Sequence, residues 1–385
     1  MSSQQHKLIK SALFHFQSGD FSLGYRILLD TALNTNNAQV FRRTLSFVEV
    51  YESKSDGQKM EVWEDFQSCS EMIKNTSIDE KETYGELILE GKNLVKNYNQ
   101  GRFVLGPVNI SLHKGDIYGL VGENGNGKTT LLTILALLNK TSGGTVKYYL
   151  KDNPKTDYNL KSKLVYIPQR TGVWYGKVLD NLKFALVHHG IKGEENELLV
   201  LMMVARFGLW KYKDLKWKEL SSGYKMRFEL ARTMLRRPEV ILLDEPLANL
   251  DILAQQVILE DLKMLSKSPV NPIAMIFSSQ QLYEVEKISD HVIYLRDGKP
   301  SDQLKLENES SELVVELDVD GSRDALETIL SAHHLKKLEY NGGVYILYFN
   351  SGFSLNDLFG VLSKSNLKIK YIRDISASTR RFFVY

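Results

Sequence analysis

Residues 122–129 carry a pattern that is typical of phosphate-binding loops. Their sequence is Gly-Glu-Asn-Gly-Asn-Gly-Lys-Thr, which matches G-x-x-x-x-G-K-[ST]. The glycines let successive backbone N–H groups surround phosphate oxygens without Cβ clashes. Lys128 can neutralise β- and γ-phosphate oxygens, and the hydroxyl of Thr129 can ligate Mg²⁺. We therefore predict that phosphate is bound by Gly122, Glu123, Asn124, Gly125, Asn126, Gly127, Lys128, Thr129 and Thr130.

Two acidic residues follow a short apolar run, 240–243, about 115 residues after the loop. Asp244 and Glu245 come at the C-terminal end of this predicted strand, where ligands bind in an open α/β sheet. Asp244 could hold Mg²⁺ through water, and Glu245 could act as general base on the attacking water. Together with the loop, this pair predicts a site for nucleotide hydrolysis.

Four further motifs occur in a fixed order around the first two. They are Tyr98, Gln169 in Tyr-Ile-Pro-Gln, Leu-Ser-Ser-Gly-Tyr at 220–224 and Ala-Asn-Leu-Asp at 248–251. With these motifs, residues 86–306 resemble the nucleotide-binding subunit of an ATP-binding cassette (ABC) ATPase. The resemblance covers a little over half of the chain. It implies ATP and Mg²⁺ as cofactors, with Tyr98 where the family stacks an aromatic ring on adenine.

The resemblance also implies that one chain supplies only part of each ATP site. Ser221 and Gly223 would contact the γ-phosphate held by an opposite cassette, and Ser222 and Asp251 are also implied to bind the nucleotide. Two cassettes, either two copies of this chain or this chain and a paralogue, would close head-to-tail around two ATP molecules. The implied metal-holding residues are Thr129, Gln169 and Asp244, and the implied catalytic residues are Glu245, Gln280 and Gln169.

The sequence departs from the family pattern at three positions. Ser222 stands where the signature usually has glycine, and Tyr224 stands where it has glutamine. Gln280 occupies the place of the family's switch histidine. Glutamine can donate a hydrogen bond to a γ-phosphate oxygen but cannot carry a titratable positive charge. Because Glu245 is present, we expect a slow ATPase, about ten- to a hundredfold below the family pattern.

Three regions are predicted along the chain. Residues 1–83 form an α-helical N-terminal domain that contains one hairpin like a tetratricopeptide unit, with a turn at Gly19-Asp20. Residues 86–306 form the cassette, where strands alternate with helices, so we expect a largely parallel α/β sheet and a helical subdomain. A helix is predicted from the loop to about Leu138.

Residues 310–385 form a small C-terminal α+β domain. Leu313, Val315, Leu317 and Val319 alternate with polar residues and predict a strand with one buried face. Ser322 is a candidate N-cap for a helix, and residues 341–343 (Asn-Gly-Gly) predict a hairpin turn. A helix over 353–362 and a last strand complete the order βαββαβ, which predicts a ferredoxin-like sandwich.

Composition is that of a globular protein. The chain has 385 residues, of which 43% are hydrophobic and 25% charged, and its net charge is +2. This charge gives no bulk attraction to nucleic acid, so we expect no nucleic-acid partner. No apolar run approaches the ~18–20 residues that span a bilayer. One cysteine, Cys69, excludes a disulfide framework and suits a reducing compartment.

These observations favour the energising subunit of an ATP-driven transporter, cytoplasmic and peripheral on the cytoplasmic face of the membrane. Such a subunit needs a separate integral membrane permease. Trp174 and Tyr175, just after Gln169, are candidates for docking that partner or for packing in the helical subdomain. Two alternatives stay open: a soluble ABC-type ATPase that switches another partner, and a nucleotide-sensing scaffold whose cassette barely hydrolyses ATP.

Overall fold

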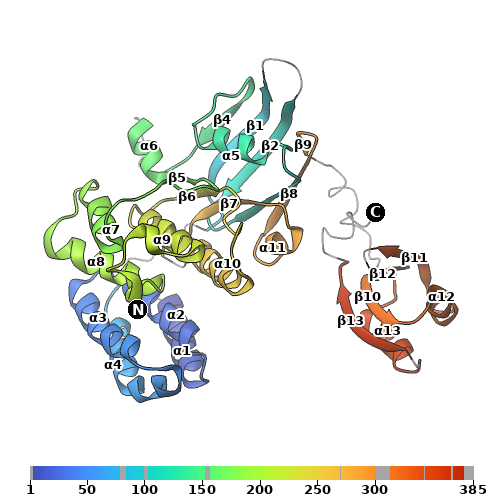
Figure 1. The fold of residues 1–385 in the computed structure, drawn as a ribbon, viewed down its shortest axis with the longest axis horizontal. Helices are drawn as coiled ribbons and strands as arrows, with labels where there is room; N and C mark the ends of the chain where they lie inside the picture. Colours follow the sequence, from blue (N-terminus) through green and yellow to red (C-terminus); the bar gives the residue numbers. More distant parts are fainter. Residues whose placement is uncertain are drawn as a thin grey trace.

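The computed structural model describes most of the chain in three parts (Figure 1). An N-terminal group of helices is followed by the predicted cassette and then by a small sheet with two helices. The structure describes residues 3–78, 84–98, 103–151, 157–268, 270–300, 313–341, 343–365 and 367–376.

The N-terminal part is helical, as predicted. A tight turn between α1 and α2 contains Gly19, whose φ of +88° suits glycine. Gly24 brings the two helices into close contact, since a Cβ there would lie 2.8 Å from the backbone nitrogen of Phe16. The elements are α1 (Ser3–Gln17), α2 (Phe21–Asn34), α3 (Ala38–Ser53), the 3₁₀ helix η1 (Asp56–Val62) and α4 (Trp63–Lys74).

The central sheet of the cassette has the order β5-β6-β7-β3-β8-β9. The first five strands run parallel and the last is antiparallel, so the predicted parallel α/β sheet is confirmed. The strand predicted over 240–243 coincides with β6. The strands are β3 (Ile117–Val121), β5 (Leu164–Ile167), β6 (Val240–Leu243), β7 (Ala274–Ser279), β8 (His291–Arg296) and β9 (Lys299–Pro300).

A second, antiparallel sheet of the cassette was not predicted from the sequence. Its order is β2-β1-β4, with β1 (Leu87–Asn97), β2 (Val104–His113) and β4 (Gly143–Tyr148). The apolar side chains of Leu89, Leu94 and Leu112 pack from this sheet onto Leu131 and Leu135. The antiparallel sheet therefore covers the helix that follows the phosphate-binding loop.

The helix after the loop is shorter than predicted. It ends at Leu135, not near Leu138, because Leu137 has a φ of +58° and Leu138 is 58% exposed. The cassette helices are α5 (Lys128–Leu135), α6 (Asp157–Lys163), α7 (Val178–Val187), α8 (Gly193–Arg206), η2 (Trp210–Tyr212), η3 (Trp217–Glu219), α9 (Ser222–Met234), α10 (Ile252–Ser266) and α11 (Leu282–Glu286).

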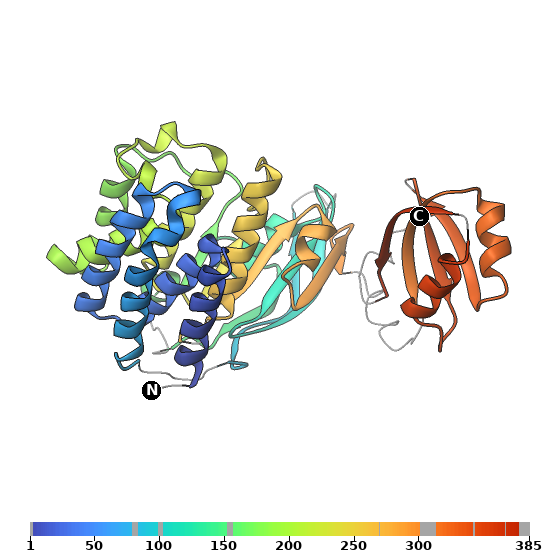
Figure 2. The same cartoon turned by 90° about the horizontal axis from the view of Figure 1, so that it is seen from below.

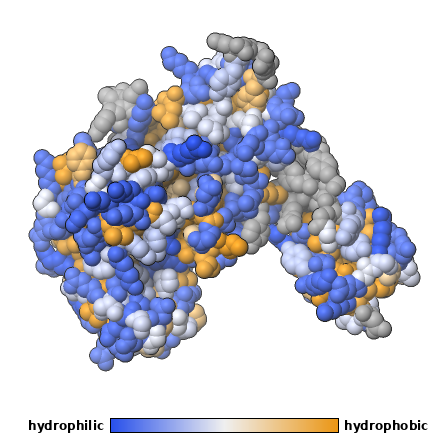
Figure 3. Space-filling view, viewed as in Figure 1, coloured by the Kyte–Doolittle hydropathy of each residue, from blue (hydrophilic) through white to orange (hydrophobic). Residues whose placement is uncertain are grey.

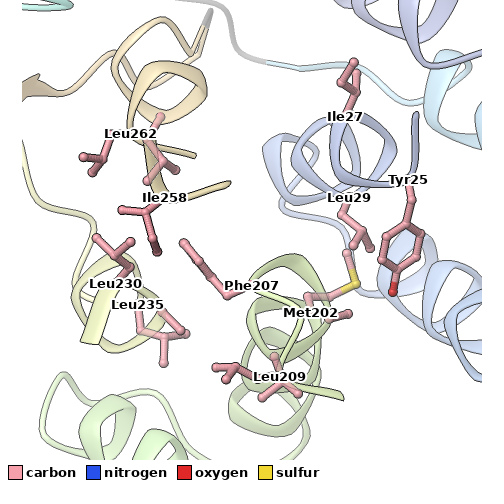
Figure 4. Close-up of a cluster of buried hydrophobic side chains, with 14 of the residues drawn as sticks. Tyr25, Ile27, Leu29, Met202, Phe207, Leu209, Leu230, Leu235, Ile258 and Leu262 are labelled. Atoms are coloured by element: carbon pink, nitrogen blue, oxygen red, sulfur yellow. The ribbon is translucent and has the colours of Figure 1, made fainter. Parts of the chain in front are cut away.

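The N-terminal helices share one hydrophobic core with the cassette. Figure 4 shows Tyr25 and Leu29 of α2 beside Met202 of α8, and the cluster continues through Phe207 to Ile258 of α10. All five side chains are less than 9% exposed. Figure 2 shows the same helices packed against the cassette from a second direction. The N-terminal helices therefore pack directly against the cassette.

Ion pairs lie at the same junction. Arg206, the last residue of α8, donates to Asp30 of α2 and, at 2.6 Å, to Asp261 of α10. Arg26 of α2 also donates to Asp261 at 3.2 Å, and to Glu260 at 2.6 Å. These contacts tie together three helices that are far apart in sequence. Each buried charge therefore has a partner of opposite sign, which burial requires.

The C-terminal part is one antiparallel sheet with the order β11-β12-β10-β13. Ser322 caps its first helix as predicted, by accepting from the backbone N–H of Ala325. The second helix starts two residues later than predicted, where Ser354 forms a capping box with Asp357. The elements are β10 (Val314–Asp320), α12 (Arg323–Leu330), β11 (Leu335–Asn341), β12 (Val344–Phe349), α13 (Leu355–Leu362) and β13 (Lys368–Asp374).

Both helices of the C-terminal part cover the same face of its sheet. Leu326 of α12 and Leu358 of α13 pack with Val315, Leu317 and Leu347 in one cluster. The element order is the predicted βαββαβ, although Gly342 of the predicted turn lies outside the described residues. Leu313, Val315, Leu317 and Val319 lie in this cluster as predicted. The prediction of a single buried face is wrong, because Val314 and Glu316 on the other face are also only 2% exposed.

The surface in view in Figure 3 is mainly hydrophilic, with small apolar groups between polar side chains. Among the described residues, no helix combines the length and the hydropathy that a bilayer span demands.

Candidate functional site

The phosphate-binding loop connects β3 to α5. Gly125 and Gly127 have φ angles of +87° and +94°, which side chains rarely tolerate. At Gly122, a Cβ would lie 2.5 Å from the carbonyl oxygen of Leu295. Glycine is therefore required at these three positions for the loop to keep its shape. Asn126 fixes the loop to the strand edge by accepting at 3.1 Å from the backbone N–H of Asp297.

Lys128 is the first residue of α5 and is only 5% exposed. Its Nζ donates to the carbonyl oxygens of Gly122 at 2.6 Å and Glu123 at 3.3 Å, and lies 3.3 Å from Oε1 of Glu245. The ammonium group therefore points into the concave side of the loop. A phosphate bound there would meet a positive charge that the fold already holds in place.

Asp244 follows β6 and is 4% exposed. Its Oδ2 accepts from the hydroxyl of Thr129 at 2.7 Å and from Tyr166 at 3.2 Å, and its Oδ1 accepts from Ser278 at 2.7 Å. Burial and the neighbouring Asp244 carboxylate raise the pKa of Tyr166, so its hydroxyl stays protonated and donates. The structure thus brings the predicted Thr129 and Asp244 together.

These residues offer the donor atoms that Mg²⁺ prefers. The Thr129 hydroxyl and the Asp244 carboxylate supply hard oxygen ligands whose atoms are 2.7 Å apart, and Gln169 can add an amide oxygen. The donor set therefore fits a magnesium ion.

Glu245 is the meeting point of the predicted catalytic side chains. Its carboxylate accepts from Nε2 of Gln169 at 2.9 Å and from Nε2 of Gln280 at 3.0 and 2.9 Å to its two oxygens. Its own backbone has a φ of +47°, and its N–H donates to Ser278 Oγ at 2.9 Å. A left-handed conformation at a non-glycine residue costs ~1–3 kcal/mol and is common at functional sites. The turn aims the carboxylate at Lys128.

Tyr98 contacts Thr130 in the first turn of α5 and Asn139 beyond the end of that helix. Its ring is 44% exposed, and its hydroxyl lies 3.2 Å from Oγ1 of Thr130. Asn139 donates to the same hydroxyl at 3.4 Å. The polar tip of Tyr98 is therefore held by the cassette while part of its ring stays open to a ligand.

The signature residues form the N-terminus of α9. Ser221 caps this helix by accepting from the backbone N–H of Tyr224 at 3.5 Å. Ser222 donates at 2.9 Å to the carbonyl oxygen of Asn249, which connects the signature to the segment before Asp251. A Cβ on Gly223 would lie 3.3 Å from Cβ of Ala254, so the two helices approach closely there.

Asp251 caps α10 by accepting from the backbone N–H of Ala254 at 2.9 Å. The hydrogen bond from Ser222 to Asn249 thus joins the N-terminus of α9 to the segment just before α10. Tyr224, in place of the family's glutamine, packs on Tyr212 with ring centroids 4.0 Å apart. It lies in the helical subdomain as part of this ring pair.

The two candidate docking aromatics differ. The Nε1 of Trp174 donates to the buried Glu229 at 2.8 Å, and the guanidinium of Arg232 lies 4.9 Å from its ring. Trp174 is thus bound into the helical subdomain. Tyr175 is 88% exposed, and Val173 on the other side is 65% exposed. These two side chains form the open part of the segment.

Two residues of the site were missed by sequence reasoning. Tyr166 lies in β5 and Ser278 in β7, and both hydroxyls bond to Asp244. Such residues could be found by looking for a hydroxyl near the carboxyl end of a buried parallel strand, because ligands bind at that edge of the sheet. Tyr166 is the first residue of the Tyr-Ile-Pro-Gln motif, but only Gln169 of that motif was assigned a role, and Ser278 was assigned none.

Comparisons with known proteins agree with this geometry. The family model described as "ABC transporter" matches residues 105–248. An uncharacterized ABC transporter ATP-binding protein of Methanocaldococcus jannaschii is 31% identical over 222 residues, which cover 56% of this chain and 77% of that protein.

A spermidine/putrescine import ATP-binding protein of Mesoplasma florum is 32% identical over 211 residues, 55% of this chain. The chain spans only 59% of the length of that relative. Among solved structures, CbiO1 of Clostridium perfringens, described as part of the ABC transporter complex CbiONQ, matches with a TM-score of 0.51 and 24% identity. The match covers 56% of this chain and 87% of that one, and shows a common fold.

Proposed function

The chain belongs to the family of ABC transporter ATP-binding proteins, and from this premise we propose that it hydrolyses Mg²⁺-ATP to drive a separate membrane permease. One observation carries the proposal. Glu245 lies in contact with Lys128, Gln169 and Gln280, next to the Thr129–Asp244 pair. The candidate base Glu245, the cation Lys128 and the Thr129–Asp244 pair thus lie together at the phosphate-binding loop.

ATP binding would exchange contacts that the protein already makes. Lys128 would leave Glu245 and its carbonyl partners for phosphate oxygens, which frees the carboxylate. Thr129, Asp244 and Gln169 would hold Mg²⁺, which when bound neutralises charge on the β- and γ-phosphates. The exposed ring of Tyr98 would stack on the base.

Hydrolysis would then use Glu245 as general base. The carboxylate would accept a proton from water as the water oxygen attacks the γ-phosphorus and the bond to the β-phosphate oxygen breaks. The amide groups of Gln169 and Gln280 would hold the carboxylate and the water in line. Because the Gln280 amide is neutral, it would stabilise the developing charge less than a protonated histidine does, so turnover would be slow.

A second cassette would complete the site. Ser221 and Ser222 are exposed at the N-terminus of α9, where backbone N–H groups and the helix dipole favour a phosphate. Directly after Asp251, Ile252 and Leu253 are 72% and 74% exposed. Large apolar side chains beside a functional motif indicate an interface. The partner would be a second copy of this chain or a paralogue.

A permease would dock on the helical subdomain. Tyr175 and Val173 are the exposed apolar side chains just after Gln169, and Trp174 between them anchors the segment to α9 through Glu229. Because this segment lies only a few residues after Gln169, a movement of the partner there would be transmitted to Gln169. The protein would therefore act at the cytoplasmic face of the membrane.

The outer parts of the chain would have supporting roles. The C-terminal residues 310–385 would form a ferredoxin-like domain, in keeping with the sheet order β11-β12-β10-β13. Residues 1–83 would form the helical domain and 86–306 the cassette. The N-terminal helices would stabilise the helical subdomain through their shared core, and the C-terminal domain would be regulatory or dimerising.

Phosphate release by the purified protein with Mg²⁺-ATP tests the proposal. We expect slow turnover that Glu245→Gln abolishes while a fluorescent ATP analogue still binds. Glu197→Gln, which changes an exposed pair with Lys183, is the matched control and should turn over normally. Absence of turnover in the wild-type protein, with and without membranes of its source, would contradict the proposal.

A further inference from the structure

A single buried hydroxyl contacts both carboxylate residues of the site. Ser278, the fifth residue of β7, is completely buried. Its Oγ donates to Oδ1 of Asp244 at 2.7 Å and accepts from the backbone N–H of Glu245 at 2.9 Å. A serine hydroxyl has one hydrogen, so both of these roles are used at once. The strand next to β6 thus holds the turn that follows β6.

We propose that Ser278 is a positioning residue for the hydrolysis site, which sets Asp244 for the metal and Glu245 for the attacking water. The inference rests on the proposed function. It assigns a role to a residue that touches neither nucleotide nor metal, so Ser278 would act through the two acids. It also explains how two successive residues can face two different reaction partners.

The contacts of Asp244 show why Ser278 has a separate role. Thr129 and Tyr166 both donate to Oδ2, whereas Ser278 is the donor to Oδ1. If Thr129 ligates Mg²⁺ through its oxygen, its hydrogen bond to Oδ2 of Asp244 can be lost. The bond from Ser278 lies on the other oxygen and can persist. It would therefore fix the rotation of the carboxylate in the metal-loaded state.

The contact with Glu245 is a backbone contact at a strained residue. Glu245 has a φ of +47°, and its N–H donates to Ser278. A buried N–H that loses its acceptor costs ~1–3 kcal/mol, so the bond helps to hold the turn in this conformation. The direction of the Glu245 side chain depends on that conformation, and so does its reach to water.

The neighbouring serine shows that these contacts belong to Ser278. Ser279 points elsewhere: its Oγ donates to Glu284 and accepts from the backbone N–H of Gln281 at 2.9 Å. Alternation along β7 places the two hydroxyls on opposite faces of the sheet. A polar residue at the end of β7 does not by itself make these bonds, because Ser279 is polar and has other partners.

Metal affinity and turnover together test the proposal. Free Mn²⁺ is followed by electron paramagnetic resonance during titration of the full-length protein with a non-hydrolysable ATP analogue. We expect Ser278→Ala to weaken Mn²⁺ binding about ten- to a hundredfold. At saturating Mg²⁺ its turnover should stay at least tenfold low, with the KM for ATP within threefold of wild type, since the misdirected Glu245 is not restored by metal.

Tyr166→Phe is the matched variant, because Tyr166 bonds Asp244 but does not contact Glu245. Its Mn²⁺ affinity should fall less, and excess Mg²⁺ should restore its turnover. Ser278→Cys keeps the size with a weak donor and should lie between wild type and Ser278→Ala. If Ser278→Ala does not fold, Ser278→Cys carries the test.

Wild-type Mn²⁺ affinity in Ser278→Ala, or in a folded Ser278→Cys if the alanine variant does not fold, would overturn the proposal. Full recovery of Ser278→Ala turnover by Mg²⁺ would also overturn the part that concerns Glu245. If the wild-type protein binds Mn²⁺ and the analogue but does not turn over, the proposed function fails, while the Mn²⁺ titration still decides the role of Ser278.

Discussion

Arg206 donates from Nη1 to Oδ1 of Asp261 at 2.6 Å, and their side chains are only 1% and 2% exposed. The pair joins the end of α8, in the helical subdomain, to α10, the helix that starts beside Asp251. Asp30 of the N-terminal helices contacts the same guanidinium. The helical subdomain, the helix after the catalytic strand and the N-terminal helices thus meet at one buried cation.

Replacement of Arg206 by Met should destabilise the protein by about 3 kcal/mol or more, because the buried Asp261 and the partly buried Asp30 each lose a partner. Arg42→Met is the matched control. Its pair with Glu194 is exposed on both sides, 50% and 64%, and should cost at most ~1 kcal/mol. Urea unfolding followed by circular dichroism measures both. Equal losses in the two variants would show that burial of the Arg206 pair has no special weight.

Gln280→His should raise turnover about ten- to a hundredfold, because a protonated imidazole can stabilise charge on the γ-phosphate. Steady-state phosphate release measures this. Gln281→His, at the adjacent exposed position, is the control and should change the rate little. A rate for Gln280→His equal to or below that of the wild type would mean that the amide contacts with Glu245 are the better arrangement here.

Tyr98→Ala should weaken ATP binding about five- to a hundredfold, the range expected from loss of one aromatic stacking contact. Tyr98→Phe removes only the hydroxyl contact with Thr130, so its affinity should stay within about threefold of wild type. Equilibrium titration with a fluorescent ATP analogue compares the two variants. If both variants lose a similar amount of ATP affinity, the hydroxyl of Tyr98 and not its ring contributes to ATP binding.

Cys69 should react slowly with thiol reagents in the folded protein. Its side chain is 1% exposed, and burial raises the pKa of its thiol to about 11. At pH 8 the reactive thiolate is then about 100-fold scarcer than for an ordinary cysteine. A disulfide reagent that releases a coloured thiolate measures the rate. Denaturant should restore normal reactivity, whereas fast native labelling would show that α4 is open.

The nucleotide site could be predicted from the sequence because its residues form short contiguous patterns. The loop from Gly122 to Thr129 and the Asp244-Glu245 pair each follow a buried strand, and strand ends in a parallel sheet meet at one edge. Contacts such as Lys128 to Glu245 follow from that geometry. The ends of helices and strands were predicted less accurately: α5 ends at Leu135, whereas the sequence predicted an end near Leu138.

Other features depend on long-range contacts that no local pattern reveals. Arg26, Asp30, Arg206 and Asp261 have the spacing of ordinary charged residues on helices, and only packing buries them together. The antiparallel sheet of β1, β2 and β4 pairs segments whose polar and apolar residues alternate irregularly, with several register shifts. Ser278 looks like one polar residue in an apolar strand until its neighbours in space are known.

Sedimentation velocity of the Glu245→Gln variant with Mg²⁺-ATP tests the central claim, that two cassettes are needed to enclose the nucleotide. The account predicts a two-cassette species with Mg²⁺-ATP and single chains with Mg²⁺-ADP, and it predicts that adding Ser221→Arg abolishes association. Single chains at saturating Mg²⁺-ATP, together with no second cassette protein recovered by the same variant from its source cells, would contradict it.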